Sequence, residues 1–210
     1  MLETSTIDLG VPMSGAELTT VTGAQGLVVF AHADGGARTS WRSDELAQFF
    51  QRRDLNTLLF DLLGADEADD LRKHGDVELL TRRLLQALDA LPPALRDMPT
   101  GLLGTDSGAA AALMVAARRP QRVRAVVSKG GRPELAASVL GDVRAPTLLI
   151  VGAADPEVLD FNRQALARLR CEKRIDIVPR ATHLFLEAGA LDIVAQHAGD
   201  WFAEHLGAPR

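Results

Sequence analysis

The sequence predicts an α/β fold, a mostly parallel sheet of about eight strands with helices on both faces. Short apolar runs alternate with helix-like stretches, and the run at residues 26–31 is apolar throughout, which is typical of a strand buried on both faces. Polar residues follow several runs directly, at the carboxyl ends of the strands, where α/β sheets bind ligands. Because no linker, repeat or low-complexity tract interrupts the pattern, we expect one domain over residues 1–210.

The elements are predicted from periodicity and turn residues. The strands 4–9 and 16–22 should form a hairpin around Pro12-Met13-Ser14-Gly15. Further strands are predicted at residues 26–31, 56–62, 100–103, 123–128, 146–152 and 174–178. Helical patterns separate or follow them at residues 41–53, 77–91, 109 to about 119, 133–140, 156–169 and 187–206. The acidic run at residues 66–70 is interpreted as a solvated loop.

The composition excludes several classes of function. The chain has 210 residues, 47% of them hydrophobic, which is enough for a sizeable core. Its net charge is −5 and its basic residues are scattered along the sequence, which argues against nucleic acid or an anionic membrane surface as a partner. A single cysteine excludes an internal disulfide, and neither a signal peptide nor a membrane-length apolar run is visible, so we expect a cytoplasmic protein.

The turn at residues 104–108 is the centre of the predicted site. An apolar strand enters it, a helix of small residues leaves it, and Gly104 and Gly108 flank Asp106 by two positions on each side. Glycines at these two places permit a sharp strand-to-helix corner, because a side chain at either would clash with neighbouring backbone. Such a corner presents Asp106 at the end of the sheet. Taken alone, Asp106 would be interpreted as a helix N-cap.

Two further polar residues follow buried strands in the same way. Asp155 comes after the strand 146–152, and His183 comes after the strand 174–178. The carboxyl ends of parallel strands lie along one edge of a sheet, so these two side chains can meet Asp106 there. The chain order is nucleophile position, acid, histidine, which is the order in α/β hydrolases. Asp155 could instead be a turn residue, and His183 an ordinary loop histidine.

Four segments in this order carry a resemblance to a known family. They are residues 29–32, 104–108, 149–155 and 181–183. The chain resembles the α/β-hydrolase superfamily, specifically its small members similar to dienelactone hydrolase, over nearly its whole length. The resemblance implies an α/β-hydrolase fold without a cap domain, since only a loop and a short helix fit between Ser128 and Pro146, where a cap is usually inserted.

The chain departs from this family at the centre of the site. Relatives of this kind carry Ser or Cys where this chain has Asp106. Haloalkane dehalogenases and epoxide hydrolases in the superfamily do use Asp there, to attack an sp³ carbon and form an ester that water then hydrolyses. Their other groups are not matched. The chain has no Tyr to protonate an epoxide oxygen, and Ser107 and Asp34 occupy the positions of their halide-holding Trp and Asn.

The resemblance also implies an oxyanion hole. The first loop, His32-Ala33-Asp34-Gly35-Gly36, resembles the family's His-Gly oxyanion loop with Ala33 in place of a glycine. The backbone N–H groups of Asp34 and Ser107 are the expected donors, and losing one such donor typically costs ~3 kcal/mol in the chemical step. If Asp34 faces inward, it forms a like-charged pair with Asp106, and one of the two carboxyls would hold its proton more tightly.

Substrate contacts are predicted from residues on the same loops. Lys129 and Arg132 follow another strand and could meet an anionic substrate, as could Arg38 on the first loop, although a solvated turn explains each of them equally well. Trp41 could contribute an indole N–H, and His32 is interpreted as structural.

The sequence therefore predicts a hydrolase for a small ester, lactone or activated alkyl carbon. Asp106 acts as nucleophile or orients water, His183 is the general base, and Asp155 holds its tautomer. The alternative is a non-catalytic binding or regulatory protein that keeps the pocket without the chemistry. No metal or organic cofactor is implied, because no metal-ligand spacing or phosphate-cradling loop is found. The expected partner is a small-molecule substrate, and the oligomeric state, a homodimer included, stays open.

Overall fold

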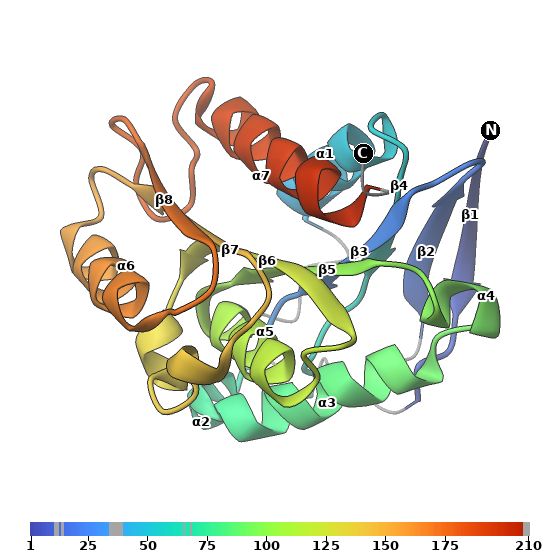
Figure 1. The fold of residues 1–210 in the computed structure, drawn as a ribbon, viewed down its shortest axis with the longest axis horizontal. Coiled ribbons are helices and arrows are strands. Elements are labelled where there is room, and N and C mark those ends of the chain that lie inside the picture. Colours follow the sequence, from blue (N-terminus) through green and yellow to red (C-terminus); the bar gives the residue numbers. More distant parts are fainter. Residues whose placement is uncertain (11–12, 14, 34–39, 65, 68, 208–210) are drawn as a thin grey trace.

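The computed structural model describes residues 1–10, 13, 15–33, 40–64, 66–67 and 69–207. Its centre is an eight-stranded sheet in the order β1-β2-β4-β3-β5-β6-β7-β8 (Figure 1). The strands are β1 (Leu2–Ile7), β2 (Ala16–Val21), β3 (Gly26–Ala31), β4 (Leu55–Leu59), β5 (Thr100–Thr105), β6 (Val123–Gly131), β7 (Thr147–Gly152) and β8 (Lys173–Val178). Only the pairings of β2 are antiparallel, so the predicted mostly parallel sheet is confirmed.

Helices cover both faces of this sheet. On one face lie α1 (Trp41–Gln51) and α7 (Ala190–Leu206), and on the other lie α3 (Val77–Ala90), α5 (Asp106–Arg118) and α6 (Pro156–Arg168) (Figure 1). Short elements join them: α2 (Leu71–Gly75), α4 (Pro93–Arg96) and the 3₁₀ turns η2 (Pro133–Ala136) and η3 (Leu140–Asp142). Among the described residues no helix is long and apolar enough to span a bilayer.

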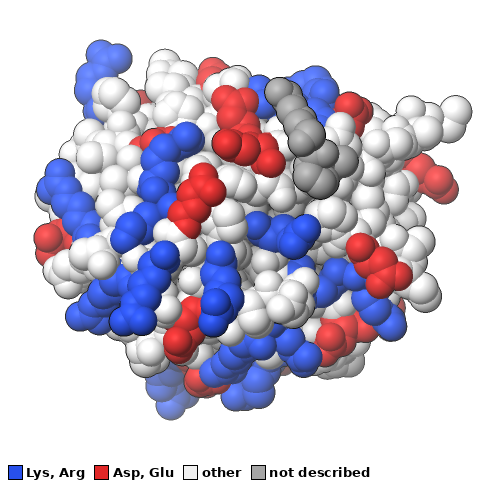
Figure 2. All heavy atoms as spheres, in the orientation of Figure 1, with Lys and Arg blue, Asp and Glu red and all other residues white. Residues whose placement is uncertain are grey.

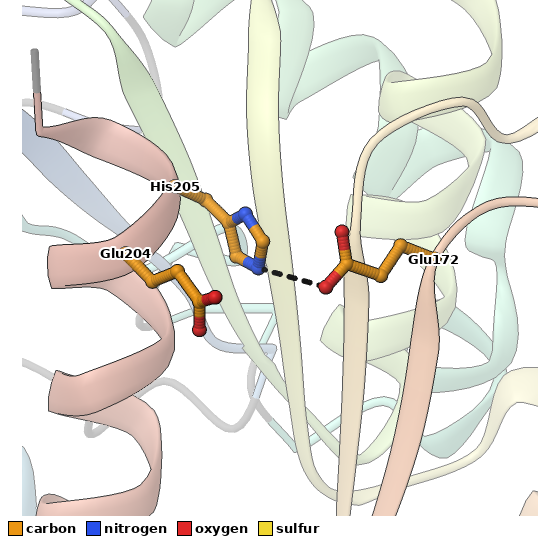
Figure 3. Close-up of side chains that lie close together, drawn as sticks. All are labelled: Glu172, Glu204 and His205. Carbon is orange, nitrogen blue, oxygen red and sulfur yellow. Dashed lines mark ion pairs between the residues drawn. The ribbon is translucent and has the colours of Figure 1, made fainter. Parts of the chain in front are cut away.

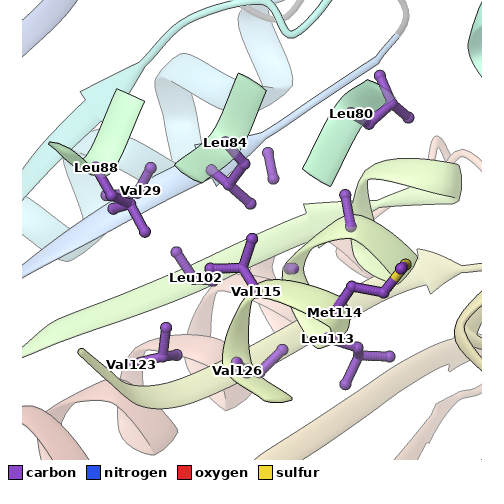
Figure 4. Close-up of a cluster of buried hydrophobic side chains, with 14 of the residues drawn as sticks. Val29, Leu80, Leu84, Leu88, Leu102, Leu113, Met114, Val115, Val123 and Val126 are labelled. Carbon is purple, nitrogen blue, oxygen red and sulfur yellow. The ribbon is translucent and has the colours of Figure 1, made fainter. Parts of the chain in front are cut away.

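The core consists of one apolar layer on each face of the sheet. In the layer beneath α3 and α5, Leu84 and Leu88 of α3 lie close to Val29 and Leu102 of the sheet and to Val115 of α5 (Figure 4). All five are almost completely buried, and burying a side chain of this size stabilises the fold by roughly 1.5–3 kcal/mol. This layer fixes the start of α5, and therefore the corner that precedes it.

Small residues let α5 approach the sheet closely. The stretch from Ala109 to Ala112 is fully buried, and α5 packs against β3, β5 and β6. Larger side chains there would lift the helix away from the strands. The amino end of α5 is therefore held against the carboxyl ends of the central strands.

The structure corrects several predicted elements. The helix expected at 133–140 consists of the turns η2 and η3, since a short connector that starts at Pro133 and meets Gly141 favours 3₁₀ geometry over a full α-helix. The last helix begins at Ala190 rather than at 187, after Gly189 in a left-handed conformation. The elements α2 and α4 were not predicted. The expected hairpin pairs Leu2 with Val21 through Ile7 with Ala16, and its turn includes residues outside the described ones.

Candidate functional site

The corner after β5 has the backbone that its two glycines predict. Asp106 has a φ of 47°, a left-handed value that is uncommon and costly for residues other than glycine, although Asp tolerates it better than most. A Cβ atom on Gly104 would lie 2.3 Å from Cα of Ala109, and one on Gly108 would lie 2.1 Å from the carbonyl oxygen of Ala31. Neither neighbour can move away, because both are backbone atoms. The tight approach holds Asp106, which is exposed, at the carboxyl edge of the sheet.

His183 and Asp155 meet at the same edge. Nδ1 of His183 lies 2.9 Å from Oδ2 of Asp155, whose side chain is mostly buried. An ionised carboxylate only accepts hydrogen bonds, so this contact places the proton of a neutral imidazole on Nδ1 and leaves Nε2 as the acceptor. The second carboxylate oxygen, Oδ1, accepts from the N–H of Val158 at 3.4 Å and caps α6. Asp155 is therefore held from both sides.

The loop that carries His183 is docked on β7 through backbone contacts. The N–H groups of Ala153 and Ala154 donate to the carbonyls of Val178 and Ala181, each at 2.9 Å. A Cβ atom on Gly152 would lie 2.2 Å from the Ala181 carbonyl oxygen, so only glycine permits this approach. The histidine loop and the acid that follows β7 are thus fixed relative to one another.

Asp106 and His183 line one pocket of about 240 Å³, a size suited to a small molecule. Its described walls come from the ends of β3, β5 and β6, from α1, from α2 and from the loop after β8. They are His32, Ala33, Ser40, Arg42, Ser43, Leu46, His74, Thr105, Asp106, Ser107, Lys129, Gly130, His183 and Leu184. Asp106 is the one carboxylate among these described residues, whereas the basic side chains are several.

Of the weaker candidates, Lys129 lies in the pocket. It is 8% exposed, it pairs with Thr105 across the sheet, and its Nζ lies 5.0 Å from the ring centre of Phe185. Ser107 also lines the pocket, in the first turn of α5, where backbone N–H groups have no partner within the helix.

The other candidates are not placed in the pocket. Trp41 is 57% exposed and is absent from the described lining residues. Arg132 forms an ion pair with Glu134, with Nε 2.8 Å from Oε1, and only its backbone N–H reaches Asp106, through the carbonyl oxygen. Asp34 and Arg38 lie outside the described residues.

Two basic residues of the pocket were not predicted from the sequence. Arg42 lies near the start of α1, and His74 lies in α2, and neither of them directly follows a predicted strand. The prediction that 66–70 is only a solvated loop is wrong for Glu67. Its side chain is mostly buried, and hydrogen bonds from Arg83 and Lys73 hold the pKa of its carboxyl far below the usual range.

Two groups of charged residues lie outside this pocket among the described residues. Lys and Arg are more frequent over α3, α5 and α6, but acidic side chains lie among them (Figure 2), as in the pair of Arg118 with Glu78. Glu172, Glu204 and His205 gather where β8 begins and α7 ends (Figure 3), at the opposite edge of the sheet from the pocket. Both glutamates are exposed, and Nε2 of His205 lies 3.7 Å from Glu172, too far for a hydrogen bond.

The comparisons with known proteins agree with this architecture. Residues 26–178 match the family model described as alpha/beta hydrolase fold, and the chain belongs to this family. It is similar to a crystal structure of dienelactone hydrolase from Anabaena variabilis ATCC 29413, with 43% identity, a TM-score of 0.90 and coverage of 97% of this chain and 98% of that one. The dienelactone-hydrolase-like fold predicted from the sequence is thus confirmed.

Two further relatives extend the comparison. A dienelactone hydrolase-like promiscuous phosphotriesterase from metagenomic libraries has a TM-score of 0.75 at 20% identity, covers 98% of each chain, and shows the fold alone. The chain is 45% identical over 201 residues to a Mycobacterium tuberculosis H37Rv protein named "Putative phosphoribosyl transferase Rv0571c". That match covers 95% of this chain but only 45% of the relative, so the chain spans about half the length of the curated relatives it matches.

Proposed function

We propose that this protein is a hydrolase for a small ester, lactone or activated alkyl carbon, with Asp106, His183 and Asp155 as its catalytic residues. One observation carries the proposal. The imidazole of His183, oriented by Asp155 at 2.9 Å, lines the same small pocket as a carboxylate on a left-handed strand-to-helix corner. Backbone that is costly to maintain, together with a histidine–carboxylate pair in a pocket, is typical of a catalytic site.

The proposed reaction has two halves. In the first, a carboxylate oxygen of Asp106 attacks the electrophilic carbon, the bond from that carbon to the leaving group breaks, and an ester or anhydride with Asp106 remains. In the second, His183 takes a proton from water through Nε2, and the resulting hydroxide attacks the carbonyl carbon of Asp106. Asp155 stabilises the imidazolium that forms. The backbone N–H groups of Ser107 and Asp34 are the proposed donors to the oxyanion.

The name of the mycobacterial relatives does not transfer to this chain. Phosphoribosyl transfer is named for a protein more than twice as long as the matched segment, and more than half of that protein has no counterpart in the match. The part that is matched belongs to a hydrolase-fold family. We therefore propose hydrolysis for this chain.

Isotope labelling during a single turnover tests the proposal. Enzyme in excess is mixed in ¹⁸O-water with a panel of esters, lactones, epoxides and haloalkanes, and the peptide that contains Asp106 is then analysed by mass spectrometry. A covalent nucleophile gains ¹⁸O in its carboxylate, because water attacks the Asp106 carbonyl. In His183→Ala the substrate-derived adduct should accumulate on the same peptide.

The alternative, a binding protein with an inherited pocket, predicts a different outcome. The wild-type chain then turns over no member of the panel, and Asp106→Ser gains esterase activity. Turnover without any label on Asp106 would leave a hydrolase in which this carboxylate orients water.

A further inference from the structure

An aspartate nucleophile leaves one proton unaccounted for. A serine passes its hydroxyl proton through the histidine to the leaving group, so that one imidazole serves both halves of the reaction. The carboxylate of Asp106 has no proton to pass on, so His183 receives none in the first half. A leaving oxygen that departs as an alkoxide needs a separate acid, and the chain contains no Tyr to provide it.

Among the described pocket residues, His74 is the group suited to this task. His183 is engaged with Asp155, and it is needed as a base in the second half. His32 is 6% exposed, and its ring stacks on Phe30 with centres 5.9 Å apart, which holds it in the wall. The ammonium of Lys129 lies 5.0 Å from the ring centre of Phe185, which holds it against that ring. An imidazolium is also a stronger acid than an ammonium or a guanidinium, so it gives up a proton to a leaving oxygen more readily. His74 is half-buried and lies on α2.

The helix that carries His74 is too short to be stable alone and is held by Glu67. Oε1 of Glu67 accepts from Nζ of Lys73, the residue before His74, at 2.7 Å. Both oxygens of Glu67 accept from the guanidinium of Arg83 on α3, at 2.6 and 2.9 Å. Oε2 also accepts from the N–H of Gly64 at 3.0 Å. One carboxylate therefore joins α2, α3 and the loop that follows β4.

The ion pair between Glu67 and Arg83 is mostly buried, so it restricts the movement of α2 more than an exposed ion pair would. The side chain of Glu67 is 13% exposed and that of Arg83 is 14% exposed. Arg83 donates in addition to the carbonyl oxygen of Leu62 at 2.8 Å, next to the point where Leu62 N–H meets the His32 carbonyl oxygen. A bidentate, mostly buried pair of this kind fixes orientation as well as distance. α2 is thereby tied to the wall of the pocket.

We propose that His74 donates the proton to the leaving oxygen and that Glu67 is the positioning residue that holds His74 in the pocket. This rests on the proposed function. In the first half, Asp106 forms its bond to carbon, the carbon–oxygen bond breaks, and the imidazolium of His74 transfers its proton to the departing oxygen. In the second half, His183 takes one proton of water, the hydroxide attacks the Asp106 carbonyl carbon, and the oxygen that leaves Asp106 takes that proton from His183. The other proton of water passes from the Asp106 carboxyl group to solvent, which restores the carboxylate. His74 regains its proton from solvent, so no oxidant or cofactor is needed.

A leaving-group series separates proton donation from a structural role. The substrates share one electrophilic carbon and differ in the leaving group, from an alkoxide through phenolates of rising acidity to 4-nitrophenolate, and to chloride where the carbon is sp³. We expect His74→Gln to slow the alkoxide substrate by ~10²-fold or more and to change the 4-nitrophenolate or chloride substrate by less than about twofold. Added imidazole should restore part of the alkoxide reaction in His74→Ala.

Positioning by Glu67 is tested with a matched control. Glu67→Gln and Lys73→Gln should reproduce the dependence on leaving group more weakly, with kcat affected more than KM. Glu78→Gln, which removes the pair with Arg118 at 2.6 Å on the outer part of α3, should leave the series unchanged. Circular dichroism confirms that each variant is folded before it is compared.

The outcomes are distinct for the two proposals. If wild-type enzyme turns over the series but His74→Gln slows every substrate equally, or none, the inference about His74 is wrong and the proposed function stands. If no substrate is turned over and Asp106 gains no ¹⁸O, the proposed function is wrong, and the inference about His74, which rests on it, is wrong as well.

Discussion

Two pairs of a histidine and a carboxylate lie at opposite edges of the sheet, and they differ in distance, in burial and in whether a pocket lies beside them. At the carboxyl edge, His183 meets Asp155 at 2.9 Å, and the imidazole lines a pocket beside Asp106. At the amino edge, His205 lies 3.7 Å from Glu172, whose side chain is 60% exposed. The first carboxylate is 16% exposed and caps a helix as well. Burial and a second anchor thus distinguish a directed hydrogen bond from a loose ion pair.

The polarity of the helices explains the difference between the edges. In a parallel α/β sheet the helices begin at the carboxyl edge and end at the amino edge, so partial positive charge gathers at the first and partial negative charge at the second. Asp106 and Asp155 lie at helix starts, whereas Arg118 and Arg168 lie in the last turns of α5 and α6. Carboxylates are therefore favoured at the carboxyl edge, and arginines at the amino edge offset the partial negative charge of the helix ends.

The largest difference between the two pairs should appear in activity. Under the proposed function, His183→Ala should lower kcat by ~10³-fold or more, because the second half loses its general base, whereas kcat/KM, which reports the first half, should fall much less. His205→Ala should stay within about twofold of wild type. Steady-state kinetics on a substrate found in the panel measures both. Comparable losses in the two variants would mean that the edge with the pocket is not the catalytic edge.

The corner after β5, and the places of Asp155 and His183 after strand ends, could be predicted from the sequence because their signals are local. Glycines around Asp106 and polar residues at strand ends can be read from a few consecutive residues, and the steric limits at Gly104 and Gly108 agree with that interpretation. The roles of Asp106, His183 and Asp155 stay predictions. Glu67 could not be predicted in the same way. Its partner Arg83 is 16 positions away in the sequence, and only the packing of α2 on α3 brings them together.

The next largest effect concerns stability, because the backbone is packed more tightly around Gly108 than around Gly141. In Gly108→Ala the new Cβ would lie 2.1 Å from a backbone oxygen, whereas in Gly141→Ala it would meet only the flexible Arg170 side chain at 3.8 Å. We expect Gly108→Ala to lower the free energy of unfolding by about 3 kcal/mol or more and Gly141→Ala to change it by under about 0.5 kcal/mol. Urea denaturation measures both. A small effect of Gly108→Ala would mean that the corner can relax.

A smaller effect on stability is expected when a buried carboxylate, Glu67, is compared with an exposed one, Glu172, and this effect should depend on pH. Glu67→Gln should cost about 2 kcal/mol at pH 7, because it leaves Arg83 without its buried counter-charge, whereas Glu172→Gln at the exposed pair should cost under about 0.5 kcal/mol. The pKa of Glu67 is lowered by folding, so its stabilisation is present above the ordinary value of 4.5 and is lost as the pH falls below it. The gap between wild type and Glu67→Gln should therefore narrow in acid, as denaturation at pH 7, 5 and 3 would measure. A gap that widened in acid would contradict the lowered pKa.

The smallest effect concerns the second role of Asp155. Its Oδ1 accepts from the N–H of Val158, so the residue caps α6 in addition to orienting His183, and Asn can keep the cap while it loses the charge. Asp155→Ala should therefore be less stable than Asp155→Asn by ~0.5–1 kcal/mol, toward the lower end because the bond is long at 3.4 Å. Under the proposed function both variants should lose activity to a similar extent, since neither carries a carboxylate to hold the His183 tautomer. Urea denaturation and steady-state kinetics separate the two roles. Equal stabilities of the two variants would mean that Asp155 does not act as a cap. Retained activity in Asp155→Asn would mean that its charge is not needed and that it only orients the imidazole.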